Sequence, residues 1–245
     1  MDKKILIAAP INEEENIFKE YLESLNHLEI PEGYTAKGYC ILAKDSPLYK
    51  YLDDGEYEFE DNGFPVEKSK GRQWTNQMLS NVGYLKNKIK EKATREGYDY
   101  LFMVDGDILL HPKTLSHLIS LNKPVVTELV YTKRGTKIGC MDGEYEGNTF
   151  YSDKKLRDYQ DGGLHEVNWS GQIMLIHSSV FTIPTIDFSP IGQMIGEYNS
   201  DWSFFCKVYV HDPNFQLYMD TKYPARHLYS EKDYKRWMEE KKHYE

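Results

Sequence analysis

Blocks of apolar residues alternate with polar stretches along the chain, and in the first half they predict strands and helices in turn. The apolar runs typical of buried strands are Ile5–Ala9, Gly38–Ala43, Tyr100–Val104 and Val125–Tyr131. Apolar residues at helical spacing predict helices after Asn12, from about Gln73 to Arg95, and after Pro112. This alternation predicts an α/β fold with a mostly parallel central sheet flanked by helices.

Residues with strong local preferences mark where the first elements begin and end. Pro10 is expected to end the first strand, and Asn12 is a good N-cap for the helix that follows. Three glutamates after Asn12 suit the positive end of that helix. Gly97 is the expected stop of the long helix before the third strand.

The second half has weaker periodicity and predicts a small antiparallel extension of the sheet. The segment from Tyr51 to Phe64 is acidic and turn-rich, which predicts a surface loop. The stretch from Lys133 to Gly163 lacks periodicity and exceeds the usual loop length, as lids and binding loops do. The elements expected after it are a strand over Gln172–Ile176, a short helix around Val180, a helix opened by Asp201, a strand over Phe215–Met219, and a capped helix over Ser230–Lys242.

Composition narrows the class of protein. A length of 245 residues suits one large domain, and a net charge of −9 argues against non-specific binding to nucleic acid. Cys40, Cys140 and Cys206 have no metal-site spacing, so we expect free thiols and a cytoplasmic location. No apolar run is long enough to span a membrane. The 20 Tyr and four Trp suit sugar-stacking surfaces, cores, or a simple bias in composition.

The triplet Asp105-Gly106-Asp107 directly follows an apolar strand, and this position indicates a site. Carboxylates are preferred ligands of Mg²⁺ and Mn²⁺, whose remaining positions are often filled by substrate phosphates. Gly106 has no Cβ, which would let a diphosphate approach the backbone. Such a triplet also arises by chance in an Asp-rich chain. However, Pro10, Asp45 and Asp105 each follow a strand, and ligands bind beyond these strand ends in parallel sheets.

Four stretches in order resemble the glycosyltransferases of the GT-A fold, in particular the family-2 enzymes that use nucleotide-sugars. They are ILIAAPINEE, YLFMVDGDILLHP, NWSGQIMLIHSSVF and SDWSFFCKVYVHDPNFQLYMDTKYPARHL. The resemblance implies a Rossmann-like GT-A domain over residues 1–245. Its expected parts are a nucleotide-donor half (1–131), a lid loop with an acceptor half (132–229) and a C-terminal helix (230–245).

The resemblance also implies roles for individual residues. Those expected to bind the donor are Ala9, Pro10, Asp45, Arg72, Asn76 and Asp105. Those expected to hold Mn²⁺ or Mg²⁺ are Asp105, Asp107 and His227. Those expected near the acceptor are Trp169, Ser170, Gly171 and Trp202. Asp201 is expected to be the catalytic base of an inverting transfer. The family usually has an acid directly before the base, whereas this chain has Ser200, so Glu197 is an alternative base.

Other classes of protein stay open at this point. Haloacid-dehalogenase-like phosphatases also carry a DxD at a strand end, but Leu109 stands where they have Thr or Val. Nucleotidyltransferases need a Gly-rich loop that APINEEEN lacks. A non-catalytic nucleotide- or glycan-binding module would have little reason to keep Asp105, Asp107 and His227 together. The acceptor is open among a glycan, a protein, a lipid carrier and a modified base. The last helix is expected to pack on the domain, with a dimer contact as the alternative.

Overall fold

The computed structural model describes residues 2–52, 57–63, 76–131, 140–141, 144–146, 149–151, 156–191 and 200–241. Its strands are β1 (Lys3–Ile11), β2 (Tyr34–Leu42), β3 (Tyr57–Asp61), β4 (Tyr100–Val104), β5 (Ile108–Leu109), β6 (Val125–Tyr131), β7 (Cys140–Met141), β8 (Glu144–Glu146), β9 (Thr149–Tyr151), β10 (Leu164–Val167), β11 (Trp169–Ser170), β12 (Ile173–His177) and β13 (Leu217–His227). Its helices are α1 (Glu15–Asn26), η1 (Pro47–Tyr51), α2 (Asn76–Arg95), α3 (Thr114–Ser120), η3 (Leu156–Tyr159), α4 (Ser178–Phe181), α5 (Ser200–His211) and α6 (Glu231–Lys241).

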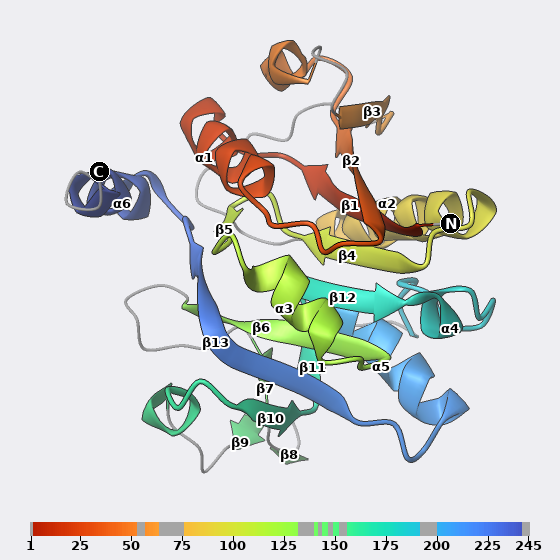
Figure 1. Cartoon of the computed structure of the whole chain (residues 1–245). Helices are drawn as coiled ribbons and strands as arrows, with labels where there is room; N and C mark the ends of the chain where they lie inside the picture. Colours follow the sequence, from red (N-terminus) through yellow and green to blue (C-terminus); the bar gives the residue numbers. More distant parts are fainter. Residues whose placement is uncertain are drawn as a thin grey trace.

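One large sheet organises the molecule, with strand order β10-β13-β6-β12-β4-β1-β2-β3 and with β5 paired to β13. Strands β3, β2, β1 and β4 are all parallel. Antiparallel pairs arise where β12 inserts between β4 and β6, and where β5 and β10 join β13. The predicted α/β architecture, with antiparallel strands in the C-terminal half, is therefore confirmed (Figure 1).

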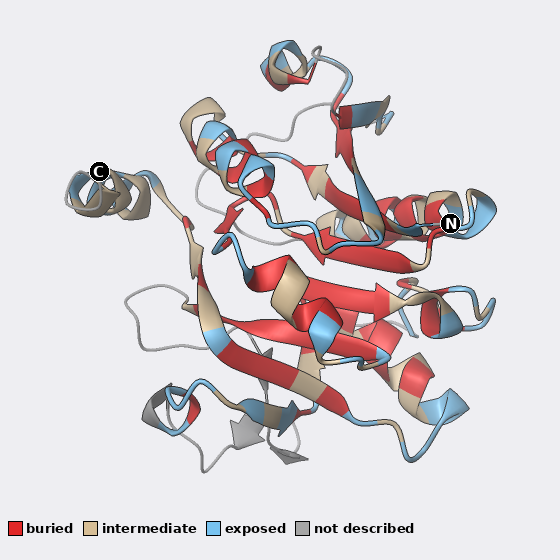
Figure 2. Cartoon of the chain, viewed as in Figure 1, coloured by how far each residue is buried: buried red, intermediate tan, exposed pale blue. Residues whose placement is uncertain are grey.

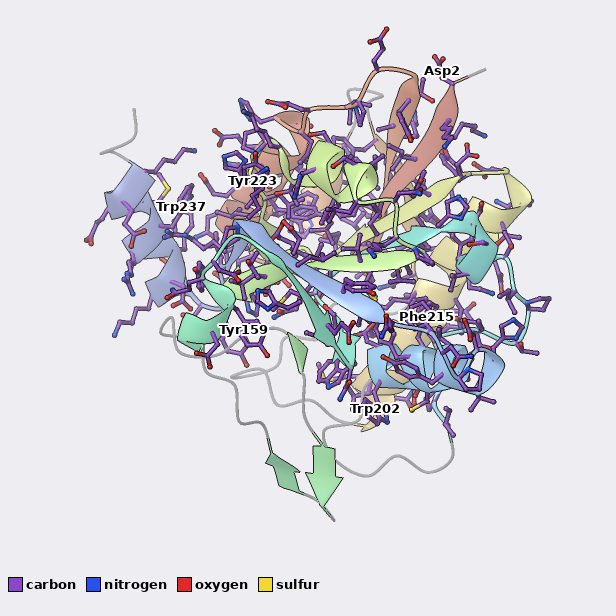
Figure 3. All side chains as sticks on the ribbon, turned by 60° about the horizontal axis from the view of Figure 1, so that its bottom comes forward. Asp2, Tyr159, Trp202, Phe215, Tyr223 and Trp237 are labelled. Carbon is purple, nitrogen blue, oxygen red and sulfur yellow. The ribbon has the colours of Figure 1, made fainter. Side chains whose placement is uncertain are left out.

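Two apolar layers cover the sheet because successive residues of a strand face opposite sides. Ile5 and Ile7 of β1 pack with α1 and α3, whereas Leu6 and Ala8 pack with α2, α4 and α5. As Figure 2 shows, the central strands are buried along most of their length. In the side-chain view of Figure 3, Trp237 lies on helix α6 at the left, whereas Phe215 and Trp202 lie toward the lower right.

Several sequence-based boundaries are wrong. The segment predicted as a surface loop contains β3, an edge strand whose Glu58 and Glu60 are paired with lysines of α2. Helix α1 begins at Glu15 with Glu14 as its N-cap, so Asn12 is not the cap. Pro10 does not end β1, because pairing with β4 stops at Ala8 and a proline beyond that point removes no bond to β4.

The structure also bears on the long loop, on the cap of the last helix and on the thiols. The long loop after Lys133 includes the short strands β7, β8 and β9 and the turn η3. The predicted cap of the last helix is confirmed, since the Asp233 backbone N–H donates to Ser230 Oγ over 3.3 Å. Cys40 and Cys206 are free thiols. Within the described residues, no helix is long and apolar enough to cross a membrane.

Helix α2 is packed against the loop before α5 through Gly83, where a Cβ would lie 2.6 Å from the Phe188 carbonyl oxygen. Replacing a helical glycine with alanine normally stabilises by about 1 kcal/mol. Here the backbone contact opposes that gain, so we expect Gly83→Ala to lower the free energy of unfolding by about 1–3 kcal/mol. Urea denaturation measures this change. Ser80→Ala, at an exposed position of the same helix, should be neutral or stabilising, and a stabilised Gly83→Ala protein would contradict the packing.

Glu128 of β6 faces Asp220 of β13 in the sheet and is 1% exposed. Burial raises the pKa of Glu128 to about 10, and repulsion from Asp220 adds to the shift. A raised pKa in the folded state means that stability falls as the pH rises from 4.5 toward 10. Asp220 Oδ1 also lies within hydrogen-bonding distance of His117 Nε2, at 3.2 Å.

Glu128→Gln should therefore be more stable than the wild-type protein at pH 9, with an advantage that shrinks toward pH 5. The physical reason is that glutamine keeps the size of the neutral carboxyl but does not ionise. The limiting slope is about 1.4 kcal/mol per pH unit. Thermal denaturation across this range measures it, with exposed Glu166→Gln as the matched control. Parallel pH curves for all three proteins would argue against a neutral Glu128.

Candidate active site

The turn after β4 and the end of β13 form the centre of the candidate site. Strand β5 pairs with β13 so that Ile108 lies opposite His227, and the Leu228 backbone N–H donates to the Asp107 carbonyl over 2.8 Å. This pairing brings His227 Nε2 to 2.8 Å from Asp107 Oδ2, although the two residues are 120 positions apart. Both side chains are largely enclosed, with 10% and 5% of their surfaces exposed.

A buried ion pair lies beside these two residues. Lys86 of α2 is 2% exposed, and its Nζ lies 2.6 Å from Asp201 Oδ1 and 3.9 Å from Asp105 Oδ1. Lys86 also donates to the Gly171 carbonyl over 3.4 Å. A Cβ at Gly171 would lie only 2.6 Å from Asp201 Oδ2, so the lack of a side chain leaves room for this carboxylate.

The protonation of these groups follows from burial and charge. Desolvation lowers the pKa of Lys86, but attraction to Asp201 and Asp105 outweighs it, and the net shift is upward. Desolvation raises the pKa of Asp201, and Lys86 opposes that shift. Desolvation also raises the pKa of Asp105 to about 7, against the attraction of Lys86. Because 40% of the Asp105 side chain is exposed, water offsets part of this desolvation.

Three backbone positions before β12 connect the parts of the site. The Ser170 hydroxyl is buried and lies 2.8 Å from Thr127 Oγ1, while Gly171 contacts Lys86 and Asp201. The backbone carbonyl of Gln172 accepts a hydrogen bond from the Asp105 backbone N–H over 2.9 Å, and the side-chain Nε2 of Gln172 lies 3.2 Å from His227 Nδ1. The segment 170–172 therefore touches the ion pair, the triplet and the distant histidine.

The structure brings together the predicted residues Asp105, Asp107, Asp201, His227 and Gly171. Trp169 and Trp202 are next to each other, with their ring centroids 6.5 Å apart at a near-perpendicular angle. Ala9 is buried in the core, Pro10 is partly exposed at the end of β1, and Asp45 is exposed in the turn before η1. Arg72 and Glu197 lie outside the described residues, as does the side chain of Asn76.

Gly106 has a different neighbour from the one expected. A Cβ at this position would lie 2.7 Å from Ile11 Cδ1, so the glycine allows the turn to pack on the end of β1.

Sequence reasoning missed Lys86 and Gln172. The signal for Lys86 was available, because it falls on the apolar stripe of α2 beside Leu85 and Ile89, where a lysine is rarely buried without a partner. Gln172 gave no such signal, because an amide at the start of a strand is unremarkable.

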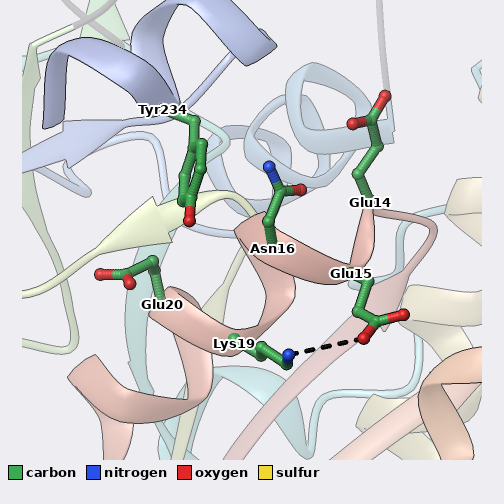
Figure 4. A pocket seen from close by; sticks show the side chains of 6 residues that line it. All are labelled: Glu14, Glu15, Asn16, Lys19, Glu20 and Tyr234. Atoms are coloured by element: carbon green, nitrogen blue, oxygen red, sulfur yellow. Dashed lines mark ion pairs between the residues drawn. The ribbon is translucent and has the colours of Figure 1, made fainter. Parts of the chain in front are cut away.

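A cavity of about 430 Å³ lies elsewhere, between α1 and α6 (Figure 4). Its lining residues are Glu14, Glu15, Asn16, Lys19, Glu20 and Tyr234. Three glutamates make it unsuitable for an anionic donor, and it includes none of the predicted site residues. The buried network around Asp105 and Asp201 is therefore the stronger candidate for chemistry.

The layered sheet with acidic residues beyond β4 has the architecture of the GT-A fold. The family model "Glycosyltransferase family 25, N-terminal domain" matches residues 40–182, which is more than half of the chain, and this protein belongs to that family. The matched region contains the Asp105-Gly106-Asp107 triplet, Lys86 and Gln172, whereas Asp201 and His227 lie beyond it. Comparison with curated proteins gave no match.

Solved structures with similar folds include TarS from S. aureus. TarS 1–349 in complex with UDP has 15% identity and a TM-score of 0.53, with 97% of this chain and 63% of that chain covered. S. aureus TarS has 15% identity and a TM-score of 0.52, with 97% of this chain and 38% of that chain covered. A197 from STIV is a weaker match, with 12% identity, a TM-score of 0.45, and 92% and 85% of the two chains covered. The chain thus spans less than two thirds of TarS, and the likeness to TarS supports the fold.

The buried pair of Lys86 and Asp201 predicts a large loss of stability when one partner is removed. Lys86→Met leaves the Asp201 carboxylate buried without its cation, which typically costs about 3–5 kcal/mol. The loss should grow as the pH rises above the unfolded-state pKa of Asp, about 3.9, because Asp201 then ionises in the unfolded chain but, without Lys86, resists ionising in the folded protein. Denaturant unfolding at several pH values measures it.

Two variants serve as controls for this pair. Lys88→Met removes a more exposed partner of Glu60 and should cost at most about 1 kcal/mol. The double variant Lys86→Met/Asp201→Asn should recover part of the loss, because the Asp201 charge is removed together with its cation. Equal losses in the Lys86 and Lys88 variants would show that the buried pair is not a stabilising unit.

Proposed function

We propose that this protein transfers a sugar from a nucleoside diphosphate sugar to an acceptor hydroxyl, with Asp107 and His227 holding a divalent cation and Asp201 acting as the base. The observation that carries the proposal is the meeting of Asp107 and His227 at 2.8 Å, next to Asp105 and the pair of Lys86 and Asp201. The complex of TarS 1–349 with UDP supports a nucleoside diphosphate as part of the donor.

The donor atoms fit a cation that is completed by substrate. Within the described residues, no group of three His, Cys, Asp or Glu side chains is arranged to hold a metal by itself. Asp107 and His227 nevertheless provide one carboxylate oxygen and one imidazole nitrogen side by side. Mg²⁺ and Mn²⁺ are commonly held by one or two protein ligands together with substrate phosphates and water. Asp105 is the nearby carboxylate that would join them or bind the ribose.

Each residue then has a defined task in the transfer. When bound, the cation would neutralise the charge that develops on the leaving diphosphate. The acceptor oxygen forms a bond to the anomeric carbon while the bond from that carbon to the diphosphate oxygen breaks. Asp201 takes the hydroxyl proton, and Lys86 fixes the orientation of its carboxylate. If Asp201 lies on the face opposite the diphosphate, the anomeric centre is inverted.

We propose Asp201 as the base because the Lys86 ammonium holds its carboxylate beside Asp105. Glu197, the alternative base, lies outside the described residues. The Asp201 side chain keeps 7% of its surface exposed, so the acceptor hydroxyl would reach it through a small opening. Trp202 follows Asp201 in the chain and its ring contacts that of Trp169, so the two rings would border that opening. Such rings would suit an acceptor with apolar ring faces such as a sugar. The match to a glycosyltransferase family gives the phosphatase alternative no support.

The proposal predicts separable losses when the two aspartates are changed. Thermal shift with UDP should show stabilisation of the wild-type protein that depends on Mn²⁺, worth about 2.7 kcal/mol when UDP is at 100 times its Kd. Asp107→Asn should lose this stabilisation because the cation loses a ligand. Asp201→Asn should keep it, while nucleotide release from a panel of donor sugars with added acceptors falls about 10²–10⁴-fold.

Asp161→Asn is a matched control, because Asp161 also lies 2.8 Å from a histidine, His165, but on the exposed surface. It should leave both measurements unchanged. Glu197→Gln tests the other base. Full turnover by Asp201→Asn together with inactive Glu197→Gln would reassign the base, and UDP binding that ignores Mn²⁺ would contradict the metal site.

A further inference from the structure

The side chain of Gln172 lies against the imidazole nitrogen that faces away from Asp107. Gln172 Nε2 is 3.2 Å from His227 Nδ1, and His227 Nε2 is 2.8 Å from Asp107 Oδ2. In this arrangement the amide N–H donates to Nδ1, so the imidazole hydrogen is on Nε2 and is donated to Asp107. Both imidazole nitrogens of His227 therefore have hydrogen-bond partners without a cation.

A bound cation would change which imidazole nitrogen of His227 carries the hydrogen. A neutral imidazole binds a metal through the nitrogen that has no hydrogen, and the other nitrogen then carries the hydrogen and donates it. If Nε2 faces a cation shared with Asp107, Nδ1–H requires an acceptor. Gln172 Oε1 is such an acceptor, because a half-turn of the amide exchanges its oxygen with the nitrogen that now faces Nδ1.

Nothing else in the described structure holds the amide in one orientation. Gln172 Oε1 is buried and has no hydrogen-bond partner among the described residues. The hydrogen bond with His227 therefore decides whether the amide nitrogen or the amide oxygen of Gln172 points at the ring. An unpartnered buried acceptor typically costs about 1–3 kcal/mol, a cost that leucine at this position would not have. An amide here is therefore better explained by its contact with His227 than by stability.

We infer that Gln172 is a positioning residue that orients His227 for a divalent cation, with its amide turning as the imidazole hydrogen moves from Nε2 to Nδ1. The inference rests on the proposed function, since it assumes a cation between Asp107 and His227. The backbone carbonyl of Gln172 also accepts a hydrogen bond from the Asp105 N–H, so one residue supports both sides of the site. Partners of this kind typically change metal affinity about 10–100-fold when they are removed.

The test is the Mn²⁺ affinity of the whole chain. Titration of the protein with Mn²⁺ measures it, because electron paramagnetic resonance detects the Mn²⁺ that stays free. Gln172→Leu should bind Mn²⁺ about 10–100-fold more weakly than the wild-type protein, with equal or greater thermal stability. Gln172→Glu keeps an acceptor for Nδ1–H and should restore most of the affinity. Gln216→Leu, which removes an exposed amide bonded to the Tyr218 hydroxyl, is the matched control and should bind as the wild-type protein does.

Nitrogen-15 NMR of labelled histidine gives a readout that a purely structural role would not change. The hydrogen of His227 should be on Nε2 without metal and on Nδ1 with saturating Mg²⁺, with the resonance assigned by His227→Gln. Wild-type protein that binds no Mn²⁺ would overturn the proposed cation site and this inference with it. Wild-type binding with unchanged affinity in Gln172→Leu, or a hydrogen that stays on Nε2 with Mg²⁺, would overturn the inference alone.

Discussion

The pairing of β5 with the end of β13 is the constraint on which the rest of the site depends. Two short backbone contacts, Ile108 opposite His227 and Leu228 bonded to Asp107, join the middle of the chain to its last strand. Without this register the imidazole and the carboxylate would not face each other, since a slip of one residue turns a side chain to the other face. This register therefore brings together Asp107 and His227, the pair that we propose as cation ligands.

The second determinant is the charge balance around Lys86. Three carboxylates gather near it and His227, and a single ammonium is buried among them. Lys86 offsets part of this negative charge, yet the site stays acidic overall and attractive to a cation. The same ammonium lies 2.6 Å from Asp201, so the proposed cation site and the proposed base share one neighbour. Helix α2 therefore contributes Lys86 to the candidate site as well as apolar side chains to the core.

Sequence patterns were sufficient for the architecture because buried strands and amphipathic helices follow simple periodicities. They placed β1, β2, β4 and β6, and they placed Asp105 and Asp107 at a strand end. They failed at β3, whose charged residues read as a loop, because an edge strand can carry charges that a central one cannot. The position of Lys86 on an apolar stripe indicates a buried lysine, but its partner Asp201 comes from a distant element and does not follow from the sequence. The partner of Gln172, His227, is equally distant. His227 itself was reached only through a family resemblance.

The charged edge strand has a consequence for how the protein behaves in concentrated solution. One side of β3 is bonded to β2, and within the described sheet no strand pairs with its other side. Such a ladder is a template on which another molecule can add a strand. Glu58 and Glu60, held by Lys92 and Lys88 of α2, place ionic groups along this border, next to the half-exposed ring of Phe59. A second chain would have to strip water from these ions to align there, so the edge resists intermolecular sheet growth.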